Sequence, residues 1–358
     1  MHNFPFFRVS LSLFKIFCES SEILGTNRGK FLPILKSTYK SPRFLTNGHF
    51  QTIYPFLFRK IKNVPYKRER ISTPDDDFLD LDWSKVKSSS SLVIFTHGLE
   101  GHSKRNYILG MVKLFNLKNF DCLAWNFRSC SGDMPKKKIF YHHGMTEDLE
   151  TVVNHAQSFK KYKKIFLVGF SLGGNITCNY IGKKGKNLPK KIKGAAVFST
   201  PFDLFSATES FHGKKFNKIY IYRFLRSLKK KLKMTENLLN ELNLNDKKLQ
   251  QIKDFNQWDE LVTAPLHGFK DKKEYYDKSC SKNLLSKINI PTLLVNAKND
   301  PFLGPNCFPF EEASKNPNLY LETPENGGHL GFTCFKNKPF YWSEIRTLDF
   351  FTSFSLPD

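Results

Sequence analysis

The sequence contains no run of about 18 or more uncharged apolar residues, the length that a membrane-spanning helix needs. Acidic residues are scarce, because 33 Asp and Glu stand against 56 Lys and Arg and leave a formal net charge of +23. Seven cysteines are scattered without any C-x-x-C pair. We therefore expect reduced thiols in an intracellular protein with no transmembrane helix in this chain, either cytoplasmic or associated with an endomembrane.

Signatures of metal catalysis and of nucleic-acid recognition are also missing. There is no H-E-x-x-H motif, and His142 and His143 are adjacent rather than spaced as metal ligands. No RNP signature, zinc-finger spacing or basic region with heptads accompanies the lysines, which are spread along the whole chain. We expect no metal, no cofactor and no specific nucleic-acid partner. The positive charge indicates a solvated surface, with peripheral contact to an anionic membrane as the alternative.

Residues 1–40 are predicted to form an N-terminal arm. The segment from Phe4 to Cys18 is apolar and aromatic, but Arg8 and Lys15 interrupt it and it is too short to span a bilayer. Two interpretations stay open, a helix lying in a membrane interface and a poorly ordered arm.

From about residue 71 the pattern alternates between short apolar strands and amphipathic helices, which predicts a mostly parallel sheet covered on both faces. Leu79, Leu81 and Trp83 alternate with Asp80 and Asp82 and predict a half-exposed strand after an acidic turn. The expected fold class is α/β. Its core comprises residues 41–203 and 288–358, and the buried strands are centred on residues 92–95, 122–125, 165–168, 195–198 and 292–295.

Residues 204–287 interrupt this alternation and predict a helical cap inserted above the sheet. Ile221, Leu225, Leu228 and Leu232 follow helical spacing and are flanked by basic residues. The favoured interpretation is a cap helix packed on the enzyme body, and the alternative is an access lid that also touches lipid headgroups.

The motif that carries chemistry is Gly169-Phe170-Ser171-Leu172-Gly173, which matches G-x-S-x-G. It follows a predicted buried strand and precedes a predicted helix, the context of a nucleophile elbow. The turn is so tight that the neighbours of the serine must be very small, and both glycines satisfy this requirement. Ser171 is therefore the predicted nucleophile.

A serine nucleophile needs a histidine base and a carboxylate that orients it, in the chain order Ser, Asp or Glu, His. Of the three downstream histidines, His329 alone lies in a glycine-rich loop after a strand-like segment rather than in the predicted cap. Asp300 follows the strand at residues 292–295 and is the predicted acid. The backbone amides of Leu99 and Leu172 are the predicted oxyanion donors. His97 is expected to brace its loop rather than to transfer protons.

These motifs resemble those of the AB hydrolase 4 group of α/β-hydrolases. The resemblance covers about residues 41–335 and rests on seven further stretches besides the elbow: residues 47–52, 78–83, 97–101, 126–132, 263–269, 296–302 and 327–332. It implies an α/β-hydrolase fold, a triad of Ser171, Asp300 and His329, and esterase or lipase activity on acyl esters, including medium-chain phospholipids. Ser129 stands where the motif commonly has glycine.

The predicted function is hydrolysis of lipid carboxylic esters, phospholipid or acylglycerol, through an acyl-enzyme. Transfer of the acyl group to an alcohol uses the same triad and stays open as the alternative. A non-catalytic hydrolase fold used for binding is a third hypothesis, against which the complete triad argues. The oligomeric state is not predicted.

Overall fold

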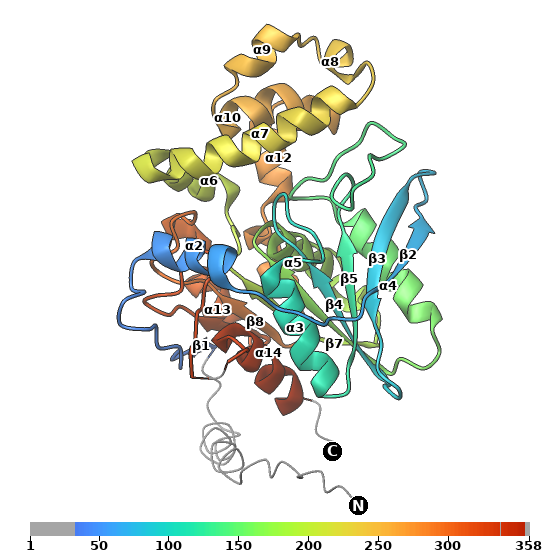
Figure 1. Cartoon of the computed structure of the whole chain (residues 1–358), viewed down its shortest axis with the longest axis vertical. Coiled ribbons are helices and arrows are strands. Elements are labelled where there is room, and N and C mark those ends of the chain that lie inside the picture. Colours follow the sequence, from blue (N-terminus) through green and yellow to red (C-terminus); the bar gives the residue numbers. More distant parts are fainter. Residues whose placement is uncertain (1–32, 337, 355–358) are drawn as a thin grey trace, which may run out of the picture. The chain divides into compact units, whose positions relative to one another are not determined.

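A computed structural model of the chain describes residues 33–336 and 338–354. Nine strands form one sheet in the order β1-β9-β8-β7-β6-β4-β5-β3-β2 (Figure 1). Neighbouring strands are parallel from β1 to β5, whereas β3 is antiparallel to both β5 and β2. The predicted α/β class with a mostly parallel sheet is confirmed.

The strands are β1 (Ile34–Leu35), β2 (Lys67–Ser72), β3 (Phe78–Ser84), β4 (Ser91–Thr96), β5 (Asp121–Asn126), β6 (Lys164–Phe170), β7 (Ile192–Phe198), β8 (Thr292–Val295) and β9 (Leu319–Glu322). The helices of the core are α2 (Gly48–Phe58), α3 (Asn106–Leu117), α4 (Glu147–Ser158), α5 (Leu172–Lys184), α13 (Phe310–Lys315) and α14 (Trp342–Ser353). Between β7 and β8 lie α6 (Leu204–Gly213), α7 (Lys218–Met234), α8 (Leu238–Glu241), α9 (Asp246–Gln251), α10 (Phe255–Trp258), α11 (Ala264–Leu266) and α12 (Lys272–Ser279).

The central strands are buried on both faces because helices cover each side of the sheet. Alternate side chains of β4 enter opposite clusters: Leu92 and Ile94 pack with residues of α4 and α5, and Val93 and Phe95 pack with residues of α3 and α14. This arrangement explains why β4 to β8 appear in the sequence as unbroken apolar runs rather than as an alternation of polar and apolar residues.

The expectation of a half-exposed strand at residues 78–84 is wrong. Asp80 and Asp82 are each only 2% exposed, because β2 covers this edge of the sheet and supplies their counter-charges. Arg68 pairs with Asp82 at 2.8 Å, and Arg70 pairs with Asp80 at 2.8 Å. β2 cannot be predicted from an apolar pattern because its residues are mostly charged. The spacing of these charges has a structural reason only in the folded sheet, where they neutralise the aspartates of β3.

The helices between β7 and β8 form a layer above the sheet, with α7 lying across it (Figure 1). They have their own apolar cluster, in which Ile221, Leu225, Leu228 and Leu232 of α7 are buried. The apolar stripe of this helix therefore packs against α8, α9 and α10 and the loop residue Phe140, and leaves most of the basic side chains at the surface.

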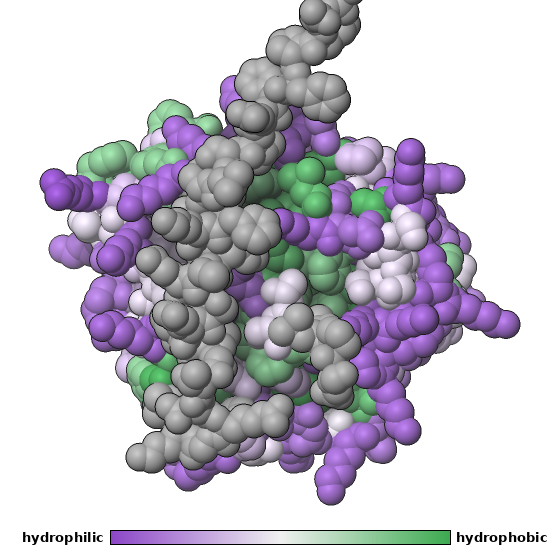
Figure 2. Space-filling view, turned by 90° about the horizontal axis from the view of Figure 1, so that it is seen from below, coloured by the Kyte–Doolittle hydropathy of each residue, from purple (hydrophilic) through white to green (hydrophobic). Residues whose placement is uncertain are grey.

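The predicted arm covered residues 1–40, and its segment from Phe4 to Cys18 lies outside the described residues. Ile34 and Leu35, at the end of that range, form β1 beside β9. Within the described residues no helix combines the length and the apolar character needed to cross a membrane. On the face opposite the cap, the visible hydrophilic side chains are spread around the margin and are not gathered in one block (Figure 2).

Candidate active site

Ser171 occupies the single residue between β6 and α5. Its backbone is strained, with φ 53° and ψ −120°, a conformation that few side-chain-bearing residues adopt. Gly173 explains how the turn fits under β4, because a Cβ there would lie 2.3 Å from the carbonyl oxygen of His97 and 2.4 Å from that of Thr96. The strand–serine–helix turn therefore has the geometry of a nucleophile elbow.

Ser171, His329 and Asp300 lie in one hydrogen-bonded chain. Oγ of Ser171 is 2.9 Å from Nε2 of His329, and Nδ1 of His329 is 2.9 Å from Oδ2 of Asp300. The side chain of Asp300 is completely buried and that of His329 is 10% exposed. An Nδ1–H donated to the carboxylate leaves Nε2 as the acceptor for the serine proton, which is the tautomer that base catalysis needs.

Three polar side chains hold the histidine loop, and the sequence alone predicts a role for none of them. The amide of His329 donates to Oγ1 of Thr52 at 2.9 Å, that of Gly328 to Oδ1 of Asn299 at 2.9 Å, and that of Leu330 to Oγ of Ser199 at 3.0 Å. Thr52 lies in a stretch that supports only the family resemblance, and Asn299 lies in the stretch that also contains the predicted acid Asp300. These two stretches are the sequence signal for both residues.

Helix α2 brings Thr52 to this loop. Its first residue, Gly48, lies so close to Asn299 that a Cβ would come within 1.9 Å of the Asn299 carbonyl oxygen. Asn47 caps the helix by accepting hydrogen bonds from the amides of His49 and Phe50. Pro55 inside the helix and the high apolar content of residues 48–58 obscured its period in the sequence.

The loop after β4 faces the serine, as expected for an oxyanion loop. Three of its amides have partners inside the protein: Gly98 donates to Tyr107 Oη at 3.2 Å, Glu100 to Tyr141 Oη at 2.9 Å, and Gly101 to the Gly98 carbonyl at 2.9 Å. Leu99 lies between them and lines the same cavity as Ser171. Leu172 begins α5 directly after the serine.

His97 braces this loop, as its position in the sequence predicts. Its Nε2 accepts a hydrogen bond from the amide of Phe127 at 3.1 Å, so Nδ1 carries the proton that it donates to the carbonyl of Gly98 at 2.8 Å. Burial lowers the pKa of His97 to about 3. The imidazole is therefore neutral at physiological pH and acts as a fixed spacer between two loops.

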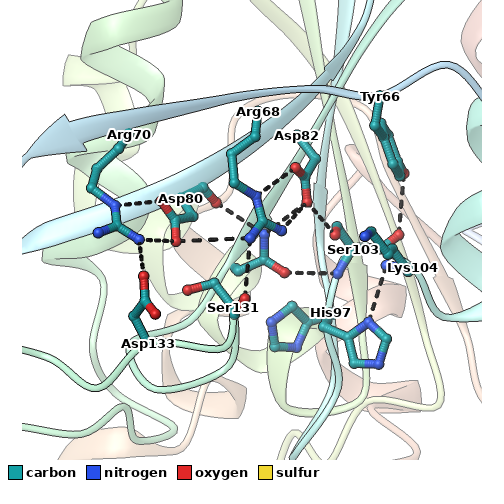
Figure 3. Close-up of polar contacts among 12 residues, drawn as sticks. Tyr66, Arg68, Arg70, Asp80, Asp82, His97, Ser103, Lys104, Ser131 and Asp133 are labelled. Atoms are coloured by element: carbon teal, nitrogen blue, oxygen red, sulfur yellow. Dashed lines mark hydrogen bonds and ion pairs between the residues drawn. The ribbon is translucent and has the colours of Figure 1, made fainter.

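The far end of the same loop is tied to the β2–β3 edge (Figure 3). Ser103 donates its amide to Oδ1 of Asn126 at 2.9 Å and its hydroxyl to Asp82, and its carbonyl accepts from Tyr66 Oη at 3.1 Å. Asn126 also donates to Asp82 at 3.2 Å. The buried aspartates of β3 thus position the backbone that presents Leu99.

Glu100 connects the loop after β4 to the cap. Its carboxylate accepts hydrogen bonds from Tyr141 Oη at 2.7 Å and from the hydroxyl of Ser227, and it pairs with Nζ of Lys231 at 2.6 Å. Ser227 and Lys231 are one turn apart on α7, and the Lys231 side chain is 17% exposed. The cap helix is therefore fixed to the residue that follows Leu99.

Ser129 has a positive φ of 64°, which explains why glycine is common at this position of the motif. Its buried Oγ has no partner among the described residues, although it borders a small cavity of about 30 Å³ beneath α7. No group of three or more potential metal-ligating side chains comes together in the part of the chain that the structure describes.

Ser171 and His329 open into a cavity of about 320 Å³ between the core and the cap. Its walls come from α2, the loop after β4, α7 and the Asp300 loop. The aromatic side chains among them are Phe56, Tyr107, Phe211, Tyr220, Phe224 and Phe302. The arrangement can generate an alkoxide nucleophile at the base of a largely apolar cavity.

Comparisons with known proteins identify the family of the chain. A model of the α/β-hydrolase fold matches residues 91–333. The Escherichia coli protein named "Putative esterase YheT" is 33% identical over 322 residues, covering 87% of this chain and 92% of that protein. Mouse phospholipase ABHD3 is 29% identical over 321 residues, covering 86% and 77%.

Among solved structures, a Pyrococcus furiosus esterase superposes with a TM-score of 0.56 at 18% identity and covers 88% of this chain and 100% of its own. That likeness shows the fold alone, whereas the family model and the relatives show the family. The chain belongs to the α/β-hydrolase family, in its AB hydrolase 4 group, and is an enzyme of the carboxylic ester hydrolase class.

Proposed function

We propose that the protein hydrolyses carboxylic esters of lipids, phospholipid or acylglycerol with medium-length acyl chains, through an acyl-enzyme on Ser171. The observation that carries this proposal is the unbroken chain from Ser171 Oγ through His329 to the buried Asp300, at 2.9 Å for each hydrogen bond, at the base of an apolar cavity. The phospholipase and esterase names of the relatives support the substrate class.

In this mechanism Ser171 Oγ attacks the acyl carbonyl carbon while His329 Nε2 takes the serine proton. Asp300 keeps the ring in the required tautomer and stabilises the imidazolium. The amides of Leu99 and Leu172 receive the negative charge that develops on the carbonyl oxygen. His329 then protonates the leaving alcohol, and a water molecule, deprotonated by the same histidine, releases the fatty acid and restores Ser171.

The acyl chain occupies the aromatic part of the cavity. Phe211 and Phe224 come from the cap, and Phe302 follows Asp300 and packs on the His329 ring with centroids 4.2 Å apart. A volume of about 320 Å³ suits a short or medium acyl chain with its ester group rather than two long chains. This size supports the medium-chain expectation.

The test compares wild type with Ser171→Ala. Wild type should release fatty acid from medium-chain phosphatidylcholine or monoacylglycerol and react with a fluorophosphonate probe. The variant should lose both activities, by roughly a thousandfold or more, with an unchanged unfolding transition. Hydrolysis that survives in the folded variant would reject the mechanism. Repeating the wild-type assay with added ethanol and measuring ethyl ester separates hydrolysis from acyl transfer.

Peripheral contact with a lipid surface is the partner that we propose. Helix α2 forms part of the cavity wall through Thr52 and Ile53, and it exposes Phe50, Leu57 and Phe58 by 61%, 54% and 65%. Exposed aromatic side chains beside a substrate cavity are suited to a membrane interface. Replacing Phe50 and Phe58 together by serine should reduce cosedimentation with anionic vesicles while hydrolysis of soluble esters continues; unchanged cosedimentation would contradict the contact.

A further inference from the structure

The cavity that contains Ser171 is lined by positive side chains and by no acidic one. Arg59, Lys104, Arg105 and Arg223 contribute to its wall, and Asp and Glu are absent from it among the described residues. Arg59 is neutralised from behind by Glu344 at 2.7 Å. The other three positive side chains of this wall have no ion-pair partner among the described residues.

Arg105 and Arg223 differ from five other arginines in what they contact. Arg59, Arg68, Arg70, Arg128 and Arg346 each pair with at least one carboxylate within 4.0 Å. Arg105 instead donates to the backbone carbonyl of Glu100 at 2.7 Å, and Arg223 lies over the ring of Phe56 with its Cζ 4.2 Å from the centroid. Neither has a carboxylate partner among the described residues.

The two guanidinium groups also act on each other. Arg105 comes from the loop after β4 and Arg223 from α7, so the core and the cap each bring one positive charge to the cavity. Partial burial lowers the pKa of Arg223, and the charge of Arg105 lowers it further. Two like charges at one cavity wall are unfavourable unless an anion joins them.

We propose that Arg105 and Arg223 form a phosphate subsite, which receives the headgroup phosphate of a substrate whose acyl ester lies at Ser171. Planar guanidinium forks match the oxygens of a phosphate, and the aromatic part of the same cavity accommodates the acyl chain. This inference rests on the proposed function and deepens it, because it assigns phosphorylated lipid esters, rather than neutral acylglycerols, as the preferred substrates.

The test uses two soluble substrates that differ only in the phosphate, monohexanoylglycerol and hexanoylglycerol phosphate. Wild type should have the higher kcat/KM for the phosphorylated ester. Arg223→Gln should lower that value about tenfold and leave the value for monohexanoylglycerol within about twofold. Arg105→Gln also removes the hydrogen bond to the Glu100 carbonyl, so it should lower both values, and the value for the phosphorylated ester by about tenfold more. Arg226→Gln is the matched control, because Arg226 is exposed on the same helix and does not line the cavity. Equal losses on both substrates, or no preference in wild type, would overturn the subsite.

Binding measurements separate this inference from the proposed function. Ser171→Ala protein should bind hexanoylglycerol phosphate by calorimetry, and the added Arg105→Gln and Arg223→Gln changes should remove that binding whether or not the wild type hydrolyses either ester. Inorganic phosphate provides the second arm. If it binds Ser171→Ala as tightly as the phosphorylated ester does, the site belongs to free phosphate and the headgroup assignment is overturned.

Discussion

The core and the cap use charge in opposite ways. In the core, Arg128 is 3% exposed and its guanidinium contacts three carboxylates, those of Asp75, Asp77 and Asp148. In the cap helix α7, the basic side chains point mostly to solvent, and Lys231 turns inward to a single carboxylate, Glu100. Buried ion pairs hold the backbone of the core, whereas most basic side chains of α7 have no carboxylate partner among the described residues.

The largest effect is expected from removing a paired charge in the core. Arg128→Met should lower the free energy of unfolding by about 3 to 5 kcal/mol, because it leaves Asp148 and Asp77 buried without their counter-charge. Urea unfolding followed by circular dichroism measures the loss. Arg226→Met, at an exposed position of α7, should change the same quantity by less than about 0.5 kcal/mol. Equal effects of the two substitutions would show that charge contributes to stability alike in the core and in the cap.

The cap contains a buried carboxylate without an arginine. Asp259 accepts hydrogen bonds from Tyr276 Oη at 2.7 Å and Thr263 Oγ1 at 2.8 Å, and burial raises its pKa from 3.8 to about 6. A raised carboxyl pKa stabilises the folded protein below pH 4, and this contribution is lost as the pH rises through 6.

Asp259→Asn should remove that dependence. The stability of the variant relative to wild type should increase by as much as about 3 kcal/mol between pH 4 and pH 7, measured by urea unfolding at each pH. A constant difference across this range would show that Asp259 titrates normally. The arginine partners of the core aspartates Asp80 and Asp82 help to lower the pKa values of these two groups. Replacing either aspartate by asparagine should therefore bring no gain in stability relative to wild type between pH 4 and pH 7.

A smaller effect is expected where the cap and the core share a charge. Lys231→Met should lower kcat for a soluble ester roughly tenfold with little change in KM, because Glu100 loses the partner that positions the amide of Leu99. Lys231→Arg should restore part of the rate, and Lys230→Met, at the next and exposed position, should leave it unchanged. An unaltered kcat in folded Lys231→Met would show that the cap does not position this loop.

The sequence predicted the elements whose residue pattern is complete within a short stretch of the chain. The buried strands β4 to β8 and the elbow at Ser171 follow from short apolar runs and from a motif with one steric meaning. β2 and α2 could not be predicted in this way. The charged residues of β2 are stable in a strand only beside Asp80 and Asp82, and α2 depends on its contact with Asn299, about 250 residues later in the chain.

The same distinction applies to the candidate site. Ser171, Asp300 and His329 could be proposed from their order and from the strands that precede them. Thr52 and Ser199 could not be proposed, because a hydroxyl that accepts a hydrogen bond from one backbone amide leaves no pattern in the nearby sequence. The unpaired state of Arg105 and Arg223 is likewise a property of the assembled cavity, since any arginine in a sequence could have found a carboxylate.

The contact between α2 and the histidine loop also constrains how the enzyme matures. Thr52 and His329 are 277 residues apart, and β1 pairs with β9 over a similar separation. During synthesis the N-terminal elements leave the ribosome long before their partners exist, and closing such long loops slows folding. A nascent chain can therefore build the sheet from β2 to β7 before Asp300 and His329 reach Ser171, so that the proposed triad assembles late in folding.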